Sequence, residues 1–124
     1  MDKKTKLTLA ELLKRKEQII AAKKTKKTQN LYVNSLGAII TIEEPEASLC
    51  RDVSDMEAGE GDKYMCYECI KEADLKSKEV QDAFGCAVPM DIVEMIFAPG
   101  EIPQIAVECM KLAGYMDGVK QVKN

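Results

Sequence analysis

The chain has 124 residues, of which 46% are apolar, and it carries a formal net charge of −3. This length predicts a single domain with its own hydrophobic core, which requires neither disulfides nor a metal for stability. The sequence contains no signal peptide pattern and no apolar stretch long enough to cross a bilayer, so we expect a soluble, intracellular protein whose five cysteines are reduced thiols.

Charge is distributed unevenly along the chain. Residues 1–27 carry ten Lys or Arg and three acids, whereas residues 28–124 carry eight Lys or Arg and eighteen acids. We therefore expect a basic N-terminal helix or arm over residues 1–27, a compact acidic helical domain with a hairpin over residues 28–119, and a loose tail over residues 120–124. The basic residues considered for binding in the arm are Lys14, Arg15, Lys23, Lys24, Lys26 and Lys27.

The arm predicts a helix over LTLAELLKRKEQIIAA. Thr8 and Glu11 have the spacing of a capping box, and Leu7 can pack against Leu12 across the first turn. Its narrow apolar face consists of Leu9, Leu12, Leu13 and Ile20. Three roles remain open for the basic residues: a solvated helix face, contact with an acidic protein surface, or nucleic-acid binding. The absence of aromatic residues before position 32 weakens the last role, because bases stack on aromatic rings.

A β-hairpin is predicted next, over NLYVNSLGAIITIEEP. Leu31 to Val33 is expected to pair with Ala38 to Glu43, because Gly37 can adopt the positive φ that a tight connection requires. A two-stranded hairpin is barely stable in water, so it must lie on helices or pair with another copy of the chain.

The middle of the chain predicts two helices separated by a turn. Pro45 opens the first helix, and the glycines of EAGEG, residues 57–61, form the turn that ends it. Asp62 then caps the second helix. Their buried stripes are expected to contain, in chain order, Leu49, Cys50, Val53 and Met56, then Met65, Cys66, Cys69, Ile70 and Ala73.

The last third of the chain predicts further short helices. Ser77 caps one that ends at Gly85, PMDIVEMIFAPG forms another, and a final helix runs from Pro103 to Gly114. The residues expected to face inward are Val80, Ala83, Phe84, Ile92, Val93, Ile96, Phe97, Ala106, Cys109, Met110 and Ala113. The fold class is therefore α+β and predominantly α-helical, with about five or six short helices and one β-hairpin near residues 31–43.

The CxxC pair, Cys66 and Cys69, invites a metal or redox interpretation. A four-sulfur zinc site would require cysteines from separate elements to converge, and the chain has no histidine for a mixed site. Thiol exchange requires a stabilised thiolate, which Asp62 and Glu68 would oppose. The helical spacing instead favours core packing. We expect no metal, no cofactor and no catalytic residue.

Methionine and isoleucine are abundant in the C-terminal half, beyond what two helices require if each buries one stripe. Core filling explains them, but flexible methionine-rich surfaces also suit grooves that accept varied apolar helices. The candidate partner-binding residues in such a groove are Ile92, Met95, Ile96, Ile105 and Met110.

The order of these segments resembles a known family. LTLAELLKRKEQIIAAKKTKKTQNLYVNSLGAIITIEEP, DMEAGEGDKYMCYECI and PMDIVEMIFAPGEIPQIAVECMKLAGY are similar to the XkdN-like tail assembly chaperones of contractile-tailed phages and defective prophages of Gram-positive bacteria. The resemblance runs over about residues 7–119. Its most specific pieces are GEGDKY and the block from PMDIVEMIF to KLAGY.

This resemblance implies a non-enzymatic assembly factor of the host bacterial cytoplasm that is absent from the mature virion. Its implied partners are the tape measure protein, which it would keep soluble, and the tail tube protein. Self-association is implied as well, and many such genes also yield a C-terminally extended product by ribosomal frameshifting. The resemblance implies no membrane partner and supplies no catalytic or ligand residues.

Two other classes remain as alternatives. A small nucleic-acid-binding regulator would act through the basic arm, although an acidic body repels phosphates and makes nucleic acid an unfavoured partner. A small zinc protein would use the thiols. Neither explains the distribution of apolar residues as well as a chaperone does.

Overall fold

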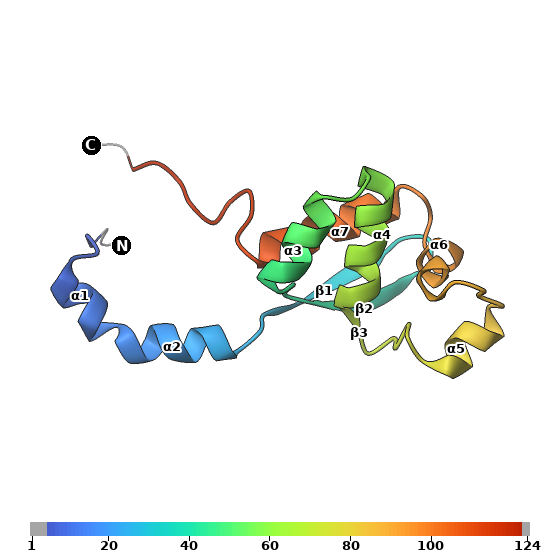
Figure 1. Ribbon diagram of the computed structural model, residues 1–124, viewed down its shortest axis with the longest axis horizontal. Helices are drawn as coiled ribbons and strands as arrows, with labels where there is room; N and C mark the ends of the chain where they lie inside the picture. The colour runs from blue at the N-terminus through green and yellow to red at the C-terminus, as the bar shows by residue number, and fades with distance from the viewer. Residues whose placement is uncertain (1–4, 123–124) are drawn as a thin grey trace.

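The computed structural model describes residues 5–122 as an α+β fold (Figure 1). A three-stranded sheet is combined with seven α-helices and one short 3-10 helix in this part of the chain, which confirms the predicted fold class. The number of helices exceeds the expected five or six, partly because the predicted N-terminal helix is divided at Arg15 into α1 (Leu9–Lys14) and α2 (Lys16–Lys24).

The sheet is antiparallel with the strand order β1, β2, β3. The hairpin is confirmed: β2 (Ala38–Glu43) has the predicted bounds, and β1 (Thr28–Val33) begins three residues earlier than predicted. Gly37 has a φ of 59°, as the tight connection requires. The third strand, β3 (Ile70–Lys71), was not predicted.

The core lies between one face of the sheet and the helices α3 (Ala47–Ser54), α4 (Ala58–Cys69) and α7 (Glu101–Leu112). The helix α4 contacts both α3 and α7, and α7 contacts β1 and β2. Alternate strand residues point to opposite faces, so Val33, Ile40 and Ile42 enter this core. Its other buried apolar members are Cys50, Met65, Cys66, Cys69, Ile70, Leu75, Ile92, Val93, Phe97, Ile102, Ile105, Ala106 and Cys109.

The predicted turn at residues 57–61 is wrong, because α4 begins at Ala58 with Glu57 as its N-cap. Asp62 therefore lies inside the helix and does not cap it. A Cβ atom at Gly61 would lie 3.0 Å from the carbonyl oxygen of Val53, so this glycine permits a close crossing of α3 and α4. Gly59 and Gly61 therefore lie within the helix and do not break it.

The helix before this crossing also differs from prediction at both ends. It begins at Ala47 after the N-cap Glu46, not at Pro45, and it ends at Ser54, which places Met56 outside it. The predicted stripe of α4 is likewise too long. The chain leaves the helix at Ile70, whose backbone pairs with Ile42, and Ala73 is exposed.

The next helix, α5 (Lys78–Ala83), has the predicted caps. Ser77 Oγ accepts a hydrogen bond from the N–H of Val80 at 3.1 Å, and Gly85 has a φ of 66°. The predictions that Ala83 and Phe84 point inward are wrong, since both are exposed, Phe84 by 44%. The short α5 makes too little contact with the core to bury both Val80 and Phe84.

The segment PMDIVEMIF forms a 3-10 helix, η1 (Pro89–Asp91), followed by α6 (Ile92–Ile96). The final helix α7 begins two residues before the predicted Pro103 and ends just before Gly114, which has a φ of 93°. Within residues 5–122, no helix has the length and apolar character required to cross a membrane.

Lys63 connects α4 to η1 and α6. Its Nζ lies 3.3 Å from a carboxylate oxygen of Glu60, 3.4 Å from Asp91 and 3.3 Å from Glu94. Burial opposes the charge of this ammonium, but the hydrogen bonds to the three carboxylates outweigh it and raise the pKa of Lys63. A nearly buried lysine is tolerated here because it has three acidic partners.

Candidate partner-binding surfaces

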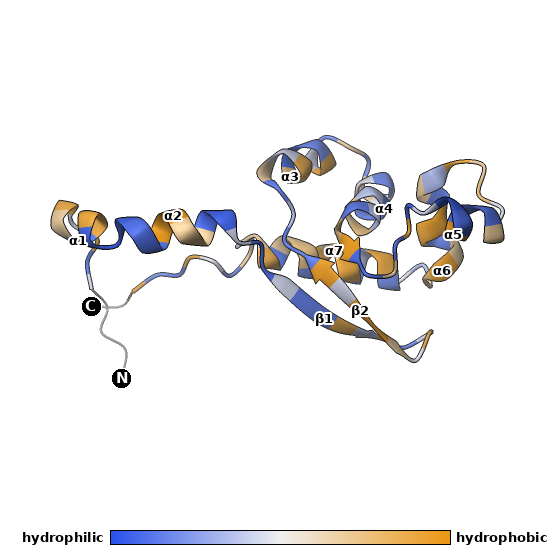
Figure 2. Ribbon diagram, turned by 90° about the horizontal axis from the view of Figure 1, so that it is seen from below, coloured by the Kyte–Doolittle hydropathy of each residue, from blue (hydrophilic) through white to orange (hydrophobic). Residues whose placement is uncertain are grey.

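The N-terminal arm, residues 5–27 of the described chain, is helical but buries no residue of α1 or α2. The N–H of Glu11 donates to Thr8 Oγ1 at 3.2 Å, which confirms half of the predicted capping box. The Glu11 carboxylate instead pairs with Arg15 at 3.0 Å. The arm exposes Leu7, Leu9, Leu12, Leu13, Ile19 and Ile20, with Leu9 exposed by 74%. Figures 1 and 2 show α1 and α2 extending away from the sheet and the remaining helices.

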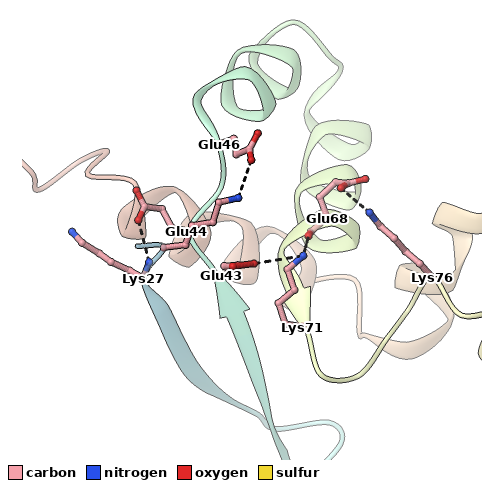
Figure 3. A network of polar contacts seen from close by, with 8 residues as sticks. Lys27, Glu43, Glu44, Glu46, Glu68, Lys71 and Lys76 are labelled. Carbon is pink, nitrogen blue, oxygen red and sulfur yellow. Dashed lines mark hydrogen bonds and ion pairs between the residues drawn. The ribbon is translucent and has the colours of Figure 1, made fainter. Parts of the chain in front are cut away.

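Polar contacts at the root of the arm, residues 26 and 27, join it to the segment that follows β2 (Figure 3). The N–H of Lys27 donates to Glu44 Oε1 at 3.2 Å, and the N–H of Glu44 donates to the carbonyl of Lys27 at 2.8 Å. The Lys26 ammonium pairs with Glu46 at 2.9 Å. These contacts continue the pairing of β1 with β2 beyond the ends of the strands.

The six predicted basic residues therefore do not form one cluster of equivalent charges. Arg15 pairs with Glu11, and Lys26 is engaged at the root. Lys14, Lys23, Lys24 and Lys27 are exposed along the arm.

A groove of about 520 Å³ lies between β1 and α7. Leu31, Val33, Ile105 and Val107 supply its apolar part. The remaining residues that line it are Tyr32, Asn34, Glu101, Pro103, Gln104 and Glu108. The groove is thus lined by both apolar and polar side chains, with Glu101 and Glu108 at the two ends of this stretch of α7. Glu108 also pairs with Lys111 at 3.7 Å.

Tyr32 extends this surface onto the face of the sheet that points away from the core. It is opposite Ile39 in the hairpin register, and the two side chains are 64% and 65% exposed. An aromatic residue paired across strands with a β-branched one normally stabilises a sheet by packing against a further layer. In residues 5–122 no helix covers this pair.

Further exposed apolar side chains occur along the chain from the end of α5 through η1 to α6, and this set of residues is called the second patch. It consists of Phe84, Val88 and Met95, all substantially exposed, together with the partly buried Cys86. The sulfur atoms of Cys86 and Met95 are 3.5 Å apart. This patch and the groove are built from different elements.

The five predicted partner-binding residues do not share one groove. Ile92 is fully buried in the core, and Ile96 and Met110 pack against the core as partly buried residues. Met95 is 50% exposed in the second patch. Ile105 is nearly buried but lines the β1–α7 groove. A stripe of helical spacing does not distinguish a core face from a groove, which explains why the five were grouped together.

The strand residues of the groove were missed at the sequence level, although a signal was present. Apolar Leu31 and Val33 alternate with Tyr32, and successive side chains of a strand point to opposite faces. If Leu31 and Val33 face the core, Tyr32 must therefore lie on the outer face of β1. The acidic residue at the groove's end, Glu101, was missed because α7 was expected to begin later.

Four of the five cysteines occupy the core, as their spacing predicts. Cys66 and Cys69 are buried in α4, and Cys50 and Cys109 are buried beside them in the core cluster. Burial, with Asp62 and Cys69 adding to it, raises the pKa of Cys66 to about 12. Across residues 5–122, no group of three or more acidic, histidine or cysteine side chains is arranged to hold a metal ion.

Comparison with protein families gives one match that spans nearly the whole chain. The model of the phage XkdN-like tail assembly chaperone protein family matches residues 2–124. Neither the curated proteins nor the solved structures compared with the chain gave a match.

Proposed function

Since the chain belongs to the phage XkdN-like tail assembly chaperone family, we propose that it binds the tape measure protein during tail assembly. It keeps that protein soluble and helps to recruit tail tube subunits. It acts without catalysis, in the cytoplasm of the host bacterium, and is absent from the finished virion.

The groove between β1 and α7 is the observation that carries this proposal. A tape measure chain presents amphipathic helical surface before the tube encloses it, and such surface aggregates unless it is covered. An apolar groove bordered by polar residues is the usual receptor for the apolar face of an amphipathic helix. Val107 and Ile105 supply part of its interior, and Glu108 supplies a charged edge.

The patch around Met95 is the second proposed contact for the same partner. Phe84, Val88 and Met95 offer flexible and aromatic side chains, which adapt to varied apolar sequences. Of the five candidate residues, Met95 and Ile105 are therefore proposed to contact the partner directly. Ile92, Ile96 and Met110 support these contacts from within or against the core.

Co-expression with the tape measure protein of the same phage tests the proposal. The wild-type chain is expected to raise the soluble fraction of the tape measure protein and to co-purify with it. Val107→Lys, which places a charge in the groove, and Met95→Lys, which places one in the patch, should each weaken co-purification. Val119→Lys is the matched control, because Val119 is 92% exposed near the C-terminus.

Each variant must retain the wild-type circular dichroism spectrum and unfolding midpoint for its result to count. Unchanged co-purification by folded Val107→Lys and Met95→Lys would exclude both surfaces. If the purified chain instead retains DNA or RNA that is released by salt, the regulator alternative gains support over the chaperone.

A further inference from the structure

The arm has apolar side chains that no other part of residues 5–122 covers. Leu12 and Leu13 of α1 are followed seven residues later by Ile19 and Ile20 of α2, a spacing of about two helical turns, with the break at Arg15 between the two pairs. All four side chains are exposed, and together they are called the stripe. Helices as short as α1 and α2 are marginal in water without tertiary contacts. The arm therefore has the composition of a segment that is stabilised by a surface beyond its own subunit.

Its own domain is poorly placed to supply that surface. The root contacts of Lys26 with Glu46 and of Lys27 with Glu44 hold the start of β1 to the end of β2. The arm departs from this fixed point in the direction away from α4, α5 and α6 (Figures 1 and 2). Folding back onto the β1–α7 groove would require the chain to reverse at Thr25 and Lys26 and to lose the Lys26–Glu46 pair.

A second copy of the chain offers a surface of complementary charge. The arm has ten basic and three acidic residues, a balance of +7, and residues 28–124 have eight basic and eighteen acidic residues, a balance of −10. Opposite charges at this level favour association between the arm of one copy and the body of another, and they discourage pairing of two bodies.

We propose that the arm of one copy docks in the β1–α7 groove of a second copy. The stripe of Leu12, Leu13, Ile19 and Ile20 packs against Leu31, Ile105 and Val107, while the arm's exposed lysines face Glu108 and Glu101 at the groove edge. A second pocket, of about 350 Å³, lies beside α3 and is lined by Glu43, Glu44, Glu46 and Asp52 among other residues. The β1–α7 groove suits the arm better than this acidic pocket. That pocket has few apolar atoms and is already lined by Lys26 of the same subunit.

The arm then regulates the groove that the proposed function assigns to the tape measure protein. In the absence of that partner, the arm of a neighbouring copy shields apolar surface that would otherwise aggregate. A tape measure helix displaces the arm because both use the same apolar interior. This exchange rests on the proposed function, whereas the docking of the arm does not.

Site-specific cross-linking of the full chain tests the docking. A photoreactive phenylalanine analogue replaces Leu13 in protein with natural isotopes, and this protein is mixed with an equal amount of unmodified ¹⁵N-labelled protein. We expect cross-links from position 13 to labelled peptides that contain residues 31–34 or 103–108. Cross-links confined to the same molecule, or cross-links to other parts of the body, would overturn the proposal.

Sedimentation velocity measures the energetics of the same contact. Leu13→Glu is expected to weaken self-association at least tenfold, and Gln18→Glu is the matched control, because Gln18 is an exposed arm residue outside the stripe. Glu108→Lys at the groove edge should weaken association as well, without placing a charge in the groove interior. A wild-type chain that stays monomeric at all concentrations, or full association of Leu13→Glu, would overturn the proposal.

The two proposals fail separately in these experiments. If the arm docks but the tape measure protein neither binds nor becomes soluble, the docking stands and the proposed function falls. If the tape measure protein binds but Leu13 gives no intermolecular cross-link in its absence, the proposed function stands and the docking falls. When both hold, Leu13→Glu should bind the tape measure protein at least as tightly as the wild type.

Discussion

Glu101 joins the first turn of α7 to Ser35 in the hairpin loop. Its carboxylate accepts hydrogen bonds from the Ser35 hydroxyl at 2.7 Å and from the Ser35 N–H at 3.0 Å. It also accepts one from the N–H of Ala98 at 2.9 Å. One side chain thus fixes the hairpin tip against the helix that forms the other wall of the groove.

We predict that this link depends on pH. The Ser35 hydroxyl, followed by the N–H groups of Ala98 and Ser35, lowers the pKa of Glu101. A carboxyl whose folded-state pKa is lowered stabilises the fold above its unfolded pKa, about 4.3, and loses this effect as the pH falls through the folded value. Glu101→Gln should therefore destabilise the protein at pH 7, and the difference from wild type should shrink below about pH 4.

Urea unfolding at several pH values measures this difference, with Glu79→Gln on α5 as the matched control. The amide signal of Ser35 in NMR spectra should also shift with the ionisation of Glu101. A Glu101→Gln variant that is equally destabilised at pH 7 and pH 3 would contradict an electrostatic link.

The two glycines of α4 should respond oppositely to alanine. A Cβ at Gly61 would meet the backbone oxygen of Val53 at 3.0 Å, whereas a Cβ at Gly59 would meet nothing within 4 Å. Gly61→Ala is expected to lower the free energy of unfolding by about 1–3 kcal/mol through overpacking. Gly59→Ala should be neutral or stabilising by up to about 1 kcal/mol, because alanine favours the helix. Urea unfolding of the pair isolates the effect of the close crossing.

Ile92 and Met95 should differ sharply in their contribution to stability, although both belong to α6. Ile92→Ala leaves a cavity in the core and should cost about 2–5 kcal/mol. Met95→Ala removes a half-exposed side chain and should change the free energy of unfolding by less than about 1 kcal/mol. Equal effects of the two substitutions in equilibrium unfolding would contradict the assignment of Ile92 to the core and Met95 to the surface.

The thiols should differ in reactivity in the folded protein. With the pKa of Cys66 raised to about 12 by burial, only on the order of 10⁻⁴ of this thiol is ionised at pH 8. Brief treatment with iodoacetamide should therefore modify the partly buried Cys86 before Cys66. Mass spectrometry of the digested protein locates the label, and unfolding in urea should make all five cysteines reactive. Rapid labelling of Cys66 in the native state would contradict its position in the core.

Local patterns predicted the hairpin and several caps because their causes lie within a few residues. Gly37 supplies the positive φ of the hairpin connection through its own backbone. Ser77 caps α5 through its own side-chain hydroxyl. The buried positions of Cys66 and Cys69 followed from their spacing on one helix. These features require no knowledge of the tertiary structure.

Features that depend on distant contacts were not predictable in the same way. The role of Gly61 comes from Val53 on another helix, and β3 exists because Ile70 finds Ile42 across the sheet. The sequence shows that Ile92 and Ile105 are apolar residues of helices. It does not show whether the core or a groove lies next to each of them. The groove itself needs β1 beside α7, a relationship between residues about 70 positions apart in the sequence.

Lys63 and its three carboxylates add a consequence for the behaviour of α6 in salt. Dissolved ions screen charges at the rim of this network, where Asp91 and Glu94 are partly exposed, but they leave the apolar contacts of Ile92 and Val93 intact. Raising the ionic strength should thus weaken the ion pairs of Lys63 with Asp91 and Glu94. The packing of Ile92 and Val93 against the core should remain. The attachment of η1 and α6 to α4 is therefore expected to combine a part that salt weakens with a part that it does not.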